Sequence, residues 1–110
     1  MAKAKTIEAD IEQHLVKRAK EIDALCFKFV SPGSNGVPDR LLIYDGKHIF
    51  IELKAPKEKP RALQNEMHRK MRKHKATVLV IDSTQAIDEL IFDLQHNRPF
   101  DASTGTLKSL

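Results

Sequence analysis

The 110-residue sequence contains no tryptophan, one tyrosine and one cysteine, Cys26. The shortage of tryptophan and tyrosine argues against a platform on which nucleic-acid bases stack. A single cysteine excludes an intrachain disulfide, and its apolar surroundings indicate a buried thiol in a reducing cytoplasm. No apolar run approaches the roughly 20 residues that span a bilayer. The basic start at 1–5 is not followed by the apolar stretch of a secretory signal, so we expect a cytoplasmic protein with no membrane partner.

Three common catalytic signatures are also missing: the glycine-rich phosphate loop, the cysteine zinc set and the nucleophile elbow. The sequence is 41% hydrophobic and 31% charged, a balance typical of one globular domain of this length. The net charge is only +4, but residues 54–75 hold nine Lys or Arg against two acids, Glu58 and Glu66. This concentration of bases indicates a polyanionic partner, although a solvated helix face would have a similar composition.

Apolar residues recur at helical spacing in three segments. We expect the first helix over residues 7–26, the second after the prolines of 55–60, and the third after a cap at Ser83 or Thr84. The expected apolar faces are formed, in chain order, by Ile7, Ile11, Leu15, Ala19, Ile22 and Cys26; by Leu63, Met67 and Met71; and by Ile87, Leu90, Ile91 and Leu94.

Four strands are expected between these helices, at residues 27–29, 41–44, 48–54 and 77–81. Asp45-Gly46 predicts a tight hairpin between the second and third strands, because both residues tolerate positive φ. The resulting order, α-β-β-β-α-β-α, predicts an α/β domain with a mixed sheet over residues 1–96. Residues 97–110 are expected to form a loose tail or an arm that orders against a partner.

The strand at 48–54 combines core residues with charge. Its side chains alternate between two faces, so its apolar face enters the core, whereas Glu52 and Lys54 share the other face with His48. A charged pair on such a strand is costly unless it is paired or binds a ligand. Most of the five histidines are interpreted as surface residues, with His48 the one nearest this pair.

Asp39 is expected across the hairpin from this pair. A two-residue turn at 45–46 and a regular register place Asp39 opposite Glu52. Two carboxylates at close range repel each other, which favours a hard divalent cation between them, with the backbone carbonyl of Leu53 as a further ligand. Lys54 could then orient a water with a lowered pKa or neutralise a phosphate transition state. The alternative is an ordinary salt-bridged cluster.

The segments around these residues resemble a known nuclease family. Pro38-Asp39, followed thirteen residues later by Glu52-Leu53-Lys54, is similar to the PD-(D/E)xK pattern. Residues 33–40, 50–56 and 78–83 resemble, respectively, the glycine-rich approach to the aspartate, the catalytic strand and the following strand of the VRR-NUC family. Gln64, ten residues after the lysine, matches a glutamine that the family often carries on the next helix. The resemblance extends over about residues 6–95 and is similar to stand-alone phage and bacterial versions.

The resemblance implies a restriction-endonuclease-like fold and DNA phosphodiester hydrolysis with Mg²⁺ or Mn²⁺. Asp39 and Glu52 would be metal ligands, and Lys54 the catalytic lysine. Family members also carry a first-helix glutamate that approaches the metal site, often through water. Glu8 and Glu12 are both candidates, with Glu8 slightly favoured by its place ahead of the apolar run. For either residue, the alternative is a solvated acid at the helix start.

Other residues are expected at the edges of the site. Gln64 is assigned a role in the site, with a capping or surface role as the alternative. Arg40 should point away from Asp39 by strand alternation and support the fold. Contacts to DNA phosphates, which position DNA without reading its sequence, are expected from Ser31, Ser34, Asn35, Arg61, Arg69, Lys70, Arg72 and Lys73.

Stand-alone members of this family resemble Holliday-junction resolvases, which implies branched DNA as the partner in a bacterial host cell. Symmetrical cutting of a four-way junction needs two active sites, so the resemblance implies a homodimer. Two alternatives stay open: a DNA-binding module of the same fold that does not cleave, and a flap or restriction-like nuclease.

Overall fold

A four-stranded sheet forms the centre of the computed structural model, which describes residues 7–97, 100–101 and 106–107. Its strands lie in the order β1-β2-β3-β4, with bounds Leu25–Lys28, Arg40–Tyr44, Lys47–Leu53 and Thr77–Ile81. The first three strands are antiparallel neighbours, and β4 runs parallel to β3. The mixed sheet and the element order predicted from the sequence are therefore confirmed.

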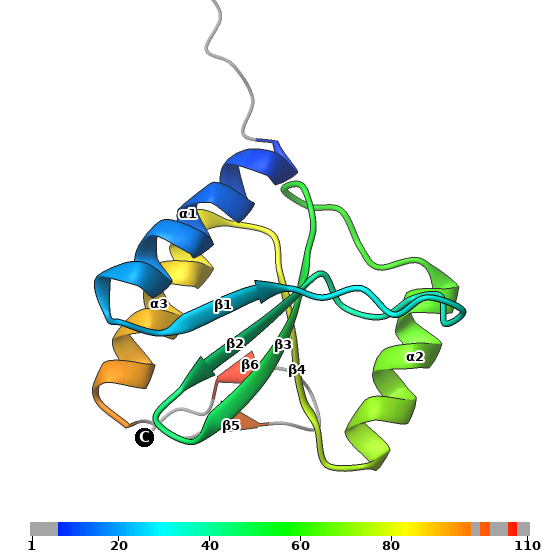
Figure 1. Ribbon diagram of the computed structural model, residues 1–110. Coiled ribbons are helices and arrows are strands. Elements are labelled where there is room, and N and C mark those ends of the chain that lie inside the picture. The colour runs from blue at the N-terminus through cyan, green and yellow to red at the C-terminus, as the bar shows by residue number, and fades with distance from the viewer. Residues whose placement is uncertain (1–6, 98–99, 102–105, 108–110) are drawn as a thin grey trace, which may run out of the picture.

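Three helices cover the two faces of this sheet (Figure 1). Helices α1 (Glu8–Glu21) and α3 (Thr84–Gln95) pack together on one face, and α2 (Ala62–Lys73) crosses the other as the connection between β3 and β4. The main apolar core lies under α1 and α3, where Ile49, Ile51 and Leu53 of β3 are at most 1% exposed. No residue of α2 belongs to that core cluster, so the α2 face of the sheet is the more polar layer.

The hairpin between β2 and β3 has the register expected from the sequence. Tyr44 pairs with Lys47 and Arg40 pairs with Ile51. The turn residues Asp45 and Gly46 have φ values of 47° and 79°, as a tight hairpin turn requires. This register brings the residue before β2 alongside the end of β3.

The first helix is shorter than the sequence predicted. It ends at Glu21, and Asp23, with φ of 61°, turns the chain out of the helix. Cys26 therefore lies in β1, where it is half-buried, and the expected helix over 7–26 is wrong at its last turn. The strand expected at 27–29 accordingly begins two residues earlier, at Leu25.

The second helix buries a different face from the one predicted. Gln64 and His68 are buried, whereas Leu63 is 56% exposed and Met67 and Met71 are half-buried. The apolar side chains alone therefore did not determine how α2 is turned toward the sheet. The buried hydrogen bond from Gln64 to Glu52 links the observed buried face of α2 to β3.

The remaining expectations concern the end of the chain. The Ser83 hydroxyl accepts a hydrogen bond from the amide of Ala86 and caps α3, as one of the two predicted caps. In the tail, β5 (Phe100–Asp101) pairs antiparallel with β6 (Thr106–Leu107). The basic start at 1–5 and the rest of the tail beyond Asn97 lie outside the described residues. Among the described helices, none is long and apolar enough to cross a bilayer.

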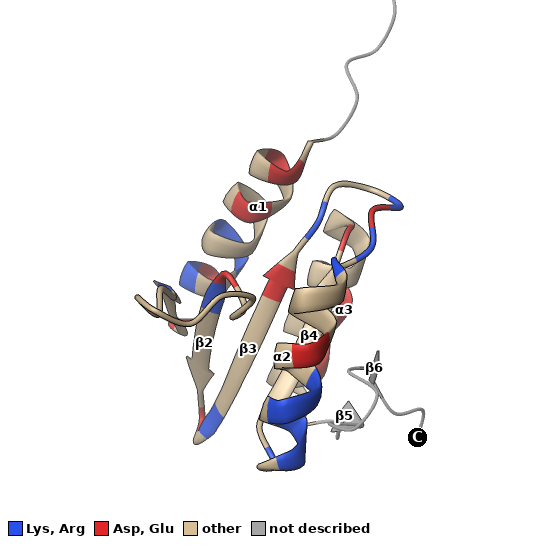
Figure 2. Cartoon of the chain, turned by 90° about the vertical axis from the view of Figure 1, so that its right-hand side faces the viewer, with Lys and Arg blue, Asp and Glu red and all other residues tan. Residues whose placement is uncertain are grey.

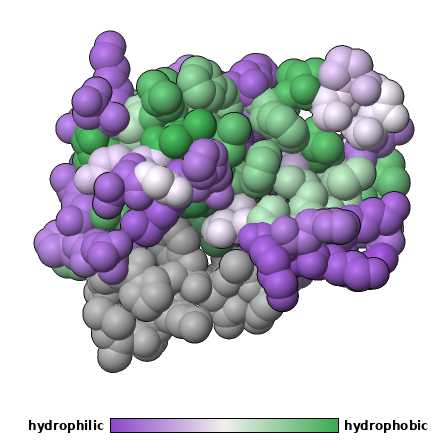
Figure 3. Space-filling view, turned by 60° about the horizontal axis from the view of Figure 1, so that its bottom comes forward, coloured by the Kyte–Doolittle hydropathy of each residue, from purple (hydrophilic) through white to green (hydrophobic). Residues whose placement is uncertain are grey.

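The surface seen from the bottom of the molecule is divided by polarity. A band with many hydrophobic residues crosses this face between hydrophilic side chains at its left and right (Figure 3). The C-terminal half of α2 is basic, and an acidic residue lies at the end of β3 (Figure 2). Charge of opposite sign is thus arranged along the α2 side of the sheet.

Candidate active site

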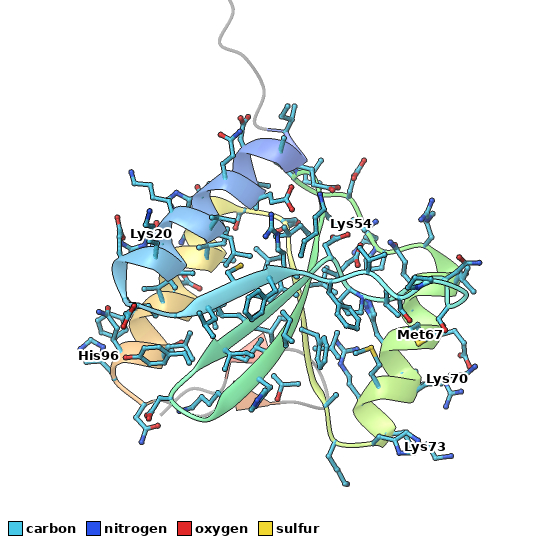
Figure 4. All side chains as sticks on the ribbon, viewed as in Figure 1. Lys20, Lys54, Met67, Lys70, Lys73 and His96 are labelled. Carbon is cyan, nitrogen blue, oxygen red and sulfur yellow. The ribbon has the colours of Figure 1, made fainter. Side chains whose placement is uncertain are left out.

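A polar pocket of about 490 Å³ opens where the end of β3, the start of α1 and the start of α2 meet. Lys54 lies where the chain leaves β3, near the first turn of α1 (Figure 4). The pocket contains all five expected catalytic side chains together with three residues from the segment between β3 and α2. Its lining consists of Glu8, Asp39, Glu52, Lys54, Glu58, Lys59, Arg61 and Gln64.

Glu52 is the deepest charged group of this pocket, with 1% of its surface exposed. Its Oε2 accepts a hydrogen bond from Gln64 Nε2 at 2.8 Å and lies 3.4 Å from Lys54 Nζ. Its Oε1 is buried without a hydrogen-bond partner among the residues that the structure describes. Burial, and then the nearby charge of Asp39, raise the pKa of Glu52 to about 7, although Lys54 opposes the shift.

Asp39 is held against the end of β3 by its own carboxylate. Its Oδ2 accepts a hydrogen bond from the backbone amide of Leu53 at 2.8 Å. Its carbonyl oxygen also accepts from the amide of Phe29, at 2.8 Å, which fixes the loop that carries it. Asp39 and Glu52 therefore meet across the hairpin, in the arrangement expected from the Asp45-Gly46 turn.

The two glutamates of α1 have different surroundings. Glu8 lines the pocket, where partial burial and then the charge of Asp39 raise its pKa. Glu12 instead pairs with Arg40, whose Nε lies 2.9 Å from Glu12 Oε2. The Arg40–Glu12 pair joins β2 to α1, which agrees with the expectation that Arg40 supports the fold. Of the two candidates, Glu8 is the one that faces Asp39 and Lys54.

Gln64 joins the first turn of α2 to the pocket. Its Oε1 accepts from the backbone amide of Arg61 at 2.9 Å, while its Nε2 donates to Glu52. One side chain therefore both caps α2 and contacts Glu52; the sequence interpretation had treated capping and a role in the site as alternatives. Gly36, at φ of +84°, lies against the start of α2, because a Cβ added there would be 2.8 Å from the Leu63 carbonyl oxygen. The loop before Asp39 thus packs directly on the start of α2.

His68 is the residue near this site that the sequence interpretation missed. It is 1% exposed, and its Nε2 lies 3.9 Å from Glu52 Oε1, so it is not a surface histidine. His48, the histidine expected nearest the site, is exposed on β3. The available signal was spacing, because Gln64 and His68 are four residues apart and share one helix face.

The expected phosphate-contacting residues fall into four groups. Arg61 lines the pocket, and Ser34 and Asn35 are exposed in the loop before Asp39, with Ser31 half-buried. Lys70 and Lys73 point outward from the far half of α2 (Figure 4).

Two arginines of α2 already have partners within the chain. Arg72 donates to the carbonyl of Val78 at 2.7 Å and ties α2 to β4. The exposed Arg69 is paired with Glu66, at 2.6 Å between Nη2 and Oε1.

The donor set suits a hard divalent cation. Within the described part of the chain, no group of three or more His, Cys, Asp or Glu side chains is arranged to hold a metal ion. Mg²⁺, however, is usually bound through one or two carboxylates and keeps several of its waters. Glu52, whose buried Oε1 has no hydrogen-bond partner among the described residues, and the nearby Asp39 carboxylate supply donors of this kind.

Comparisons with known proteins agree with this geometry. No family model matches the chain. The chain is 47% identical over 77 residues to "Putative nuclease p44" of Acyrthosiphon pisum secondary endosymbiont phage 1, an alignment that covers 69% of this chain and 83% of that protein. A solved structure described as a VRR_NUC domain superposes with a TM-score of 0.72 at 31% sequence identity, covering 77% of this chain and 94% of that one. The chain therefore belongs to the VRR-NUC family of nucleases.

Proposed function

We propose that this nuclease hydrolyses DNA phosphodiester bonds with Mg²⁺ or Mn²⁺ at the pocket formed by Asp39, Glu52 and Lys54. One observation carries the proposal: Glu52 is buried with one oxygen unpartnered, directly beside a second carboxylate and a lysine. A buried carboxylate with a raised pKa in an open pocket is typical of a functional site. In a purely structural cluster, a buried carboxylate oxygen usually has a hydrogen-bond partner.

The proposed ligands are the carboxylates of Asp39 and Glu52 and the backbone carbonyl of Leu53, with Glu8 acting through water. A hard divalent cation held there would activate a water nucleophile and neutralise charge on the phosphate. The Leu53 amide fixes one oxygen of Asp39, so the other oxygen can turn toward the pocket. The Gln64 amide fixes Glu52 in the same way.

Lys54 is proposed as the group that acts on the scissile phosphate. Its Nζ lies 3.4 Å from Glu52 Oε2, and its side chain is 12% exposed at the pocket wall. An ammonium in this position can donate to a phosphate oxygen and offset the charge that develops in the transition state. The contact with Glu52 holds the Lys54 side chain at the pocket wall.

The DNA backbone is proposed to approach along α2. Lys59 and Arg61 line the pocket itself, and Lys70 and Lys73 extend the basic surface along the helix (Figure 2). The exposed Ser34 and Asn35 add hydrogen-bond donors on the neighbouring loop. Contacts of this kind hold phosphates and give an affinity that falls as salt rises.

The proposed substrate is branched DNA, cut by a homodimer. A four-way junction is resolved by two symmetric cuts, and two copies of this pocket related by a twofold axis would supply them. The exposed Leu25 and Phe27 on the edge strand β1 and the tail after Asn97 are the proposed interface. A flap or restriction-like activity is the alternative within the same chemistry.

The test is a cleavage assay on four-way junction, flap, duplex and single-stranded DNA, with Mg²⁺, Mn²⁺ or EDTA. We expect metal-dependent cutting, strongest on the junction, that Glu52→Ala and Lys54→Ala abolish. The matched control is Glu12→Gln, which alters a carboxylate of α1 outside the pocket. Cutting that persists in EDTA, or that survives both site substitutions, would overturn the proposal. Light scattering with and without DNA tests the homodimer.

A further inference from the structure

Glu52 and His68 face each other at a distance too long for a hydrogen bond. The Nε2 of His68 lies 3.9 Å from the Oε1 of Glu52, and both residues are 1% exposed. Neither this oxygen nor either ring nitrogen of His68 has a hydrogen-bond partner within the described residues. Buried polar groups without partners are rare and costly, so two of them facing each other require an explanation.

The placement of His68 on α2 explains why these two groups face each other. Gln64 and His68 lie one helical turn apart, so both project from α2 toward the same residue of β3. Gln64 already donates to Oε2 of Glu52, and His68 lies beside Oε1. Two successive turns of one helix thus place Gln64 and His68 beside the two oxygens of a single carboxylate.

We propose that His68 is a positioning residue whose Nε2–H donates to Glu52 Oε1 when the pocket binds its divalent cation. This inference rests on the proposed function and deepens it. A shift of about 1 Å brings the two atoms to ordinary hydrogen-bond distance. Each carboxylate oxygen has two lone pairs, so both oxygens of Glu52 can accept from α2 and still face the pocket.

Burial first, and then the charges of Arg72 and Lys54, lower the pKa of His68. A neutral imidazole carries its proton on one of its two nitrogens, and the proposal assigns that proton to Nε2 because Nε2 is the nitrogen that faces Glu52. Groups that orient ligands in this way commonly change metal affinity by about 10- to 100-fold when they are removed.

Three substitutions at His68 distinguish the effect of the hydrogen-bond donor from the effect of the volume of the ring. His68→Gln can present an amide nitrogen near the position of Nε2, His68→Asn reaches only the position of Nδ1, and His68→Met has no donor. We expect Mn²⁺ affinity, measured by titration calorimetry or spin resonance, to fall about 10- to 100-fold in the Met and Asn variants and to be largely retained in the Gln variant. If His68→Met does not fold, the comparison of Gln with Asn decides.

A second measurement does not depend on cleavage. Nitrogen-15 spectra of the imidazole should show the Nε2–H tautomer. Addition of Mg²⁺, used here in place of the paramagnetic Mn²⁺, should shift the signal of the Nε2 proton downfield. Glu52→Ala should remove that shift, whereas the control Glu12→Gln should leave it. An Nδ1–H tautomer, or an Nε2–H signal that ignores Glu52→Ala, would overturn the inference.

The two levels of the proposal fail in different ways. Loss of Mn²⁺ affinity in Glu52→Ala but in none of the His68 variants overturns the role of His68 and leaves the proposed function standing. Absence of Mn²⁺ and Mg²⁺ binding by the unaltered chain overturns both.

Discussion

Gln64 donates a 2.8 Å hydrogen bond from α2 to Oε2 of Glu52 on β3, inside the protein and twelve residues away in sequence. The same side chain accepts from the backbone of Arg61 at the helix start. One amide therefore contributes both to the position of α2 and to the orientation of the deepest carboxylate. A change at Gln64 should affect the fold and the site together.

The first prediction follows from this double contact. Gln64→Ala should lower the free energy of unfolding by about 1–3 kcal/mol, because it removes a cap and leaves a buried carboxylate oxygen without its donor. At the same temperature, the rate of DNA cleavage should fall by a larger factor than the fraction of folded protein. Urea unfolding and cleavage rates measure the two effects. Asn65→Ala is the control, since that exposed amide makes only a 3.4 Å contact to Pro60; equal losses in both variants would contradict the prediction.

The second prediction concerns pH. The pKa of Glu52 is raised to about 7 from the ordinary value of 4.5, so the folded protein binds a proton more tightly than the unfolded chain. Below about pH 4.5 both states are protonated at this residue; between that pH and 7 the unfolded chain loses its proton first, and stability falls as pH rises. The loss is on the order of 3 kcal/mol at pH 8. Urea unfolding at pH 5 and pH 8 measures it.

Glu52→Gln provides the control for this pH effect. The amide cannot ionise, so the variant should lose this part of the pH dependence and should be more stable than the unaltered protein at pH 8. It should also be inactive in cleavage, as expected where a site is maintained at a cost in stability. An unchanged difference between pH 5 and pH 8 in the variant would assign the effect to other groups.

The parts of this fold that could be predicted from the sequence depend on local chemistry. Asp45-Gly46 defines its own turn, and the turn defines the register that brings Asp39 to the end of β3. The rotation of α2 has no comparable local signal. Its few apolar residues suggested that Leu63 would be buried, whereas the contact with Glu52, distant in sequence, accompanies the burial of Gln64 and His68.

The end of α1 was misplaced for a related reason. The apolar spacing continues to Cys26, but the left-handed conformation of Asp23 ends the helical path before it. Aspartate adopts that conformation more readily than most residues, yet periodicity does not reveal where it does so. The choice between Glu8 and Glu12 likewise needed the Arg40 contact, which joins residues 28 positions apart.

The third prediction uses two glycines with nearly equal φ. Gly36→Ala and Gly33→Ala both force a side chain into positive φ, at +84° and +82°, with a backbone cost of about 1–2 kcal/mol each. Only at Gly36 would the new Cβ come within 2.8 Å of a backbone atom, the Leu63 carbonyl oxygen. Gly36→Ala should therefore be the more destabilising change and the one that lowers cleavage. Equal effects at both positions, by thermal unfolding, would show that the loop and α2 are not coupled.

The fourth prediction separates the two glutamates of α1. Glu12→Gln should lower the free energy of unfolding by about 1 kcal/mol, because it weakens a largely shielded ion pair with Arg40, and should leave cleavage nearly unchanged. Glu8→Gln should have the opposite profile, with little change in stability and a reduced cleavage rate, because Glu8 faces the pocket. Chemical unfolding and initial cleavage rates distinguish them. If Glu12→Gln were the inactive variant, the first-helix role would have to be reassigned.

The fifth prediction links the cation to folding. A cation that binds Asp39 and Glu52 in the folded state replaces the proton that burial would otherwise place on Glu52, so affinity should rise with pH up to about 7. At a concentration 100 times its dissociation constant, such a cation stabilises the folded protein by about 2.7 kcal/mol. Thermal unfolding with increasing Mn²⁺ at pH 6 and pH 8 should therefore show a larger rise in melting temperature at pH 8. Glu52→Gln should remove this rise, whereas Glu12→Gln should keep it, because its carboxylate lies outside the pocket. A rise that is the same at both pH values, or that persists in Glu52→Gln, would place the cation somewhere other than beside Glu52.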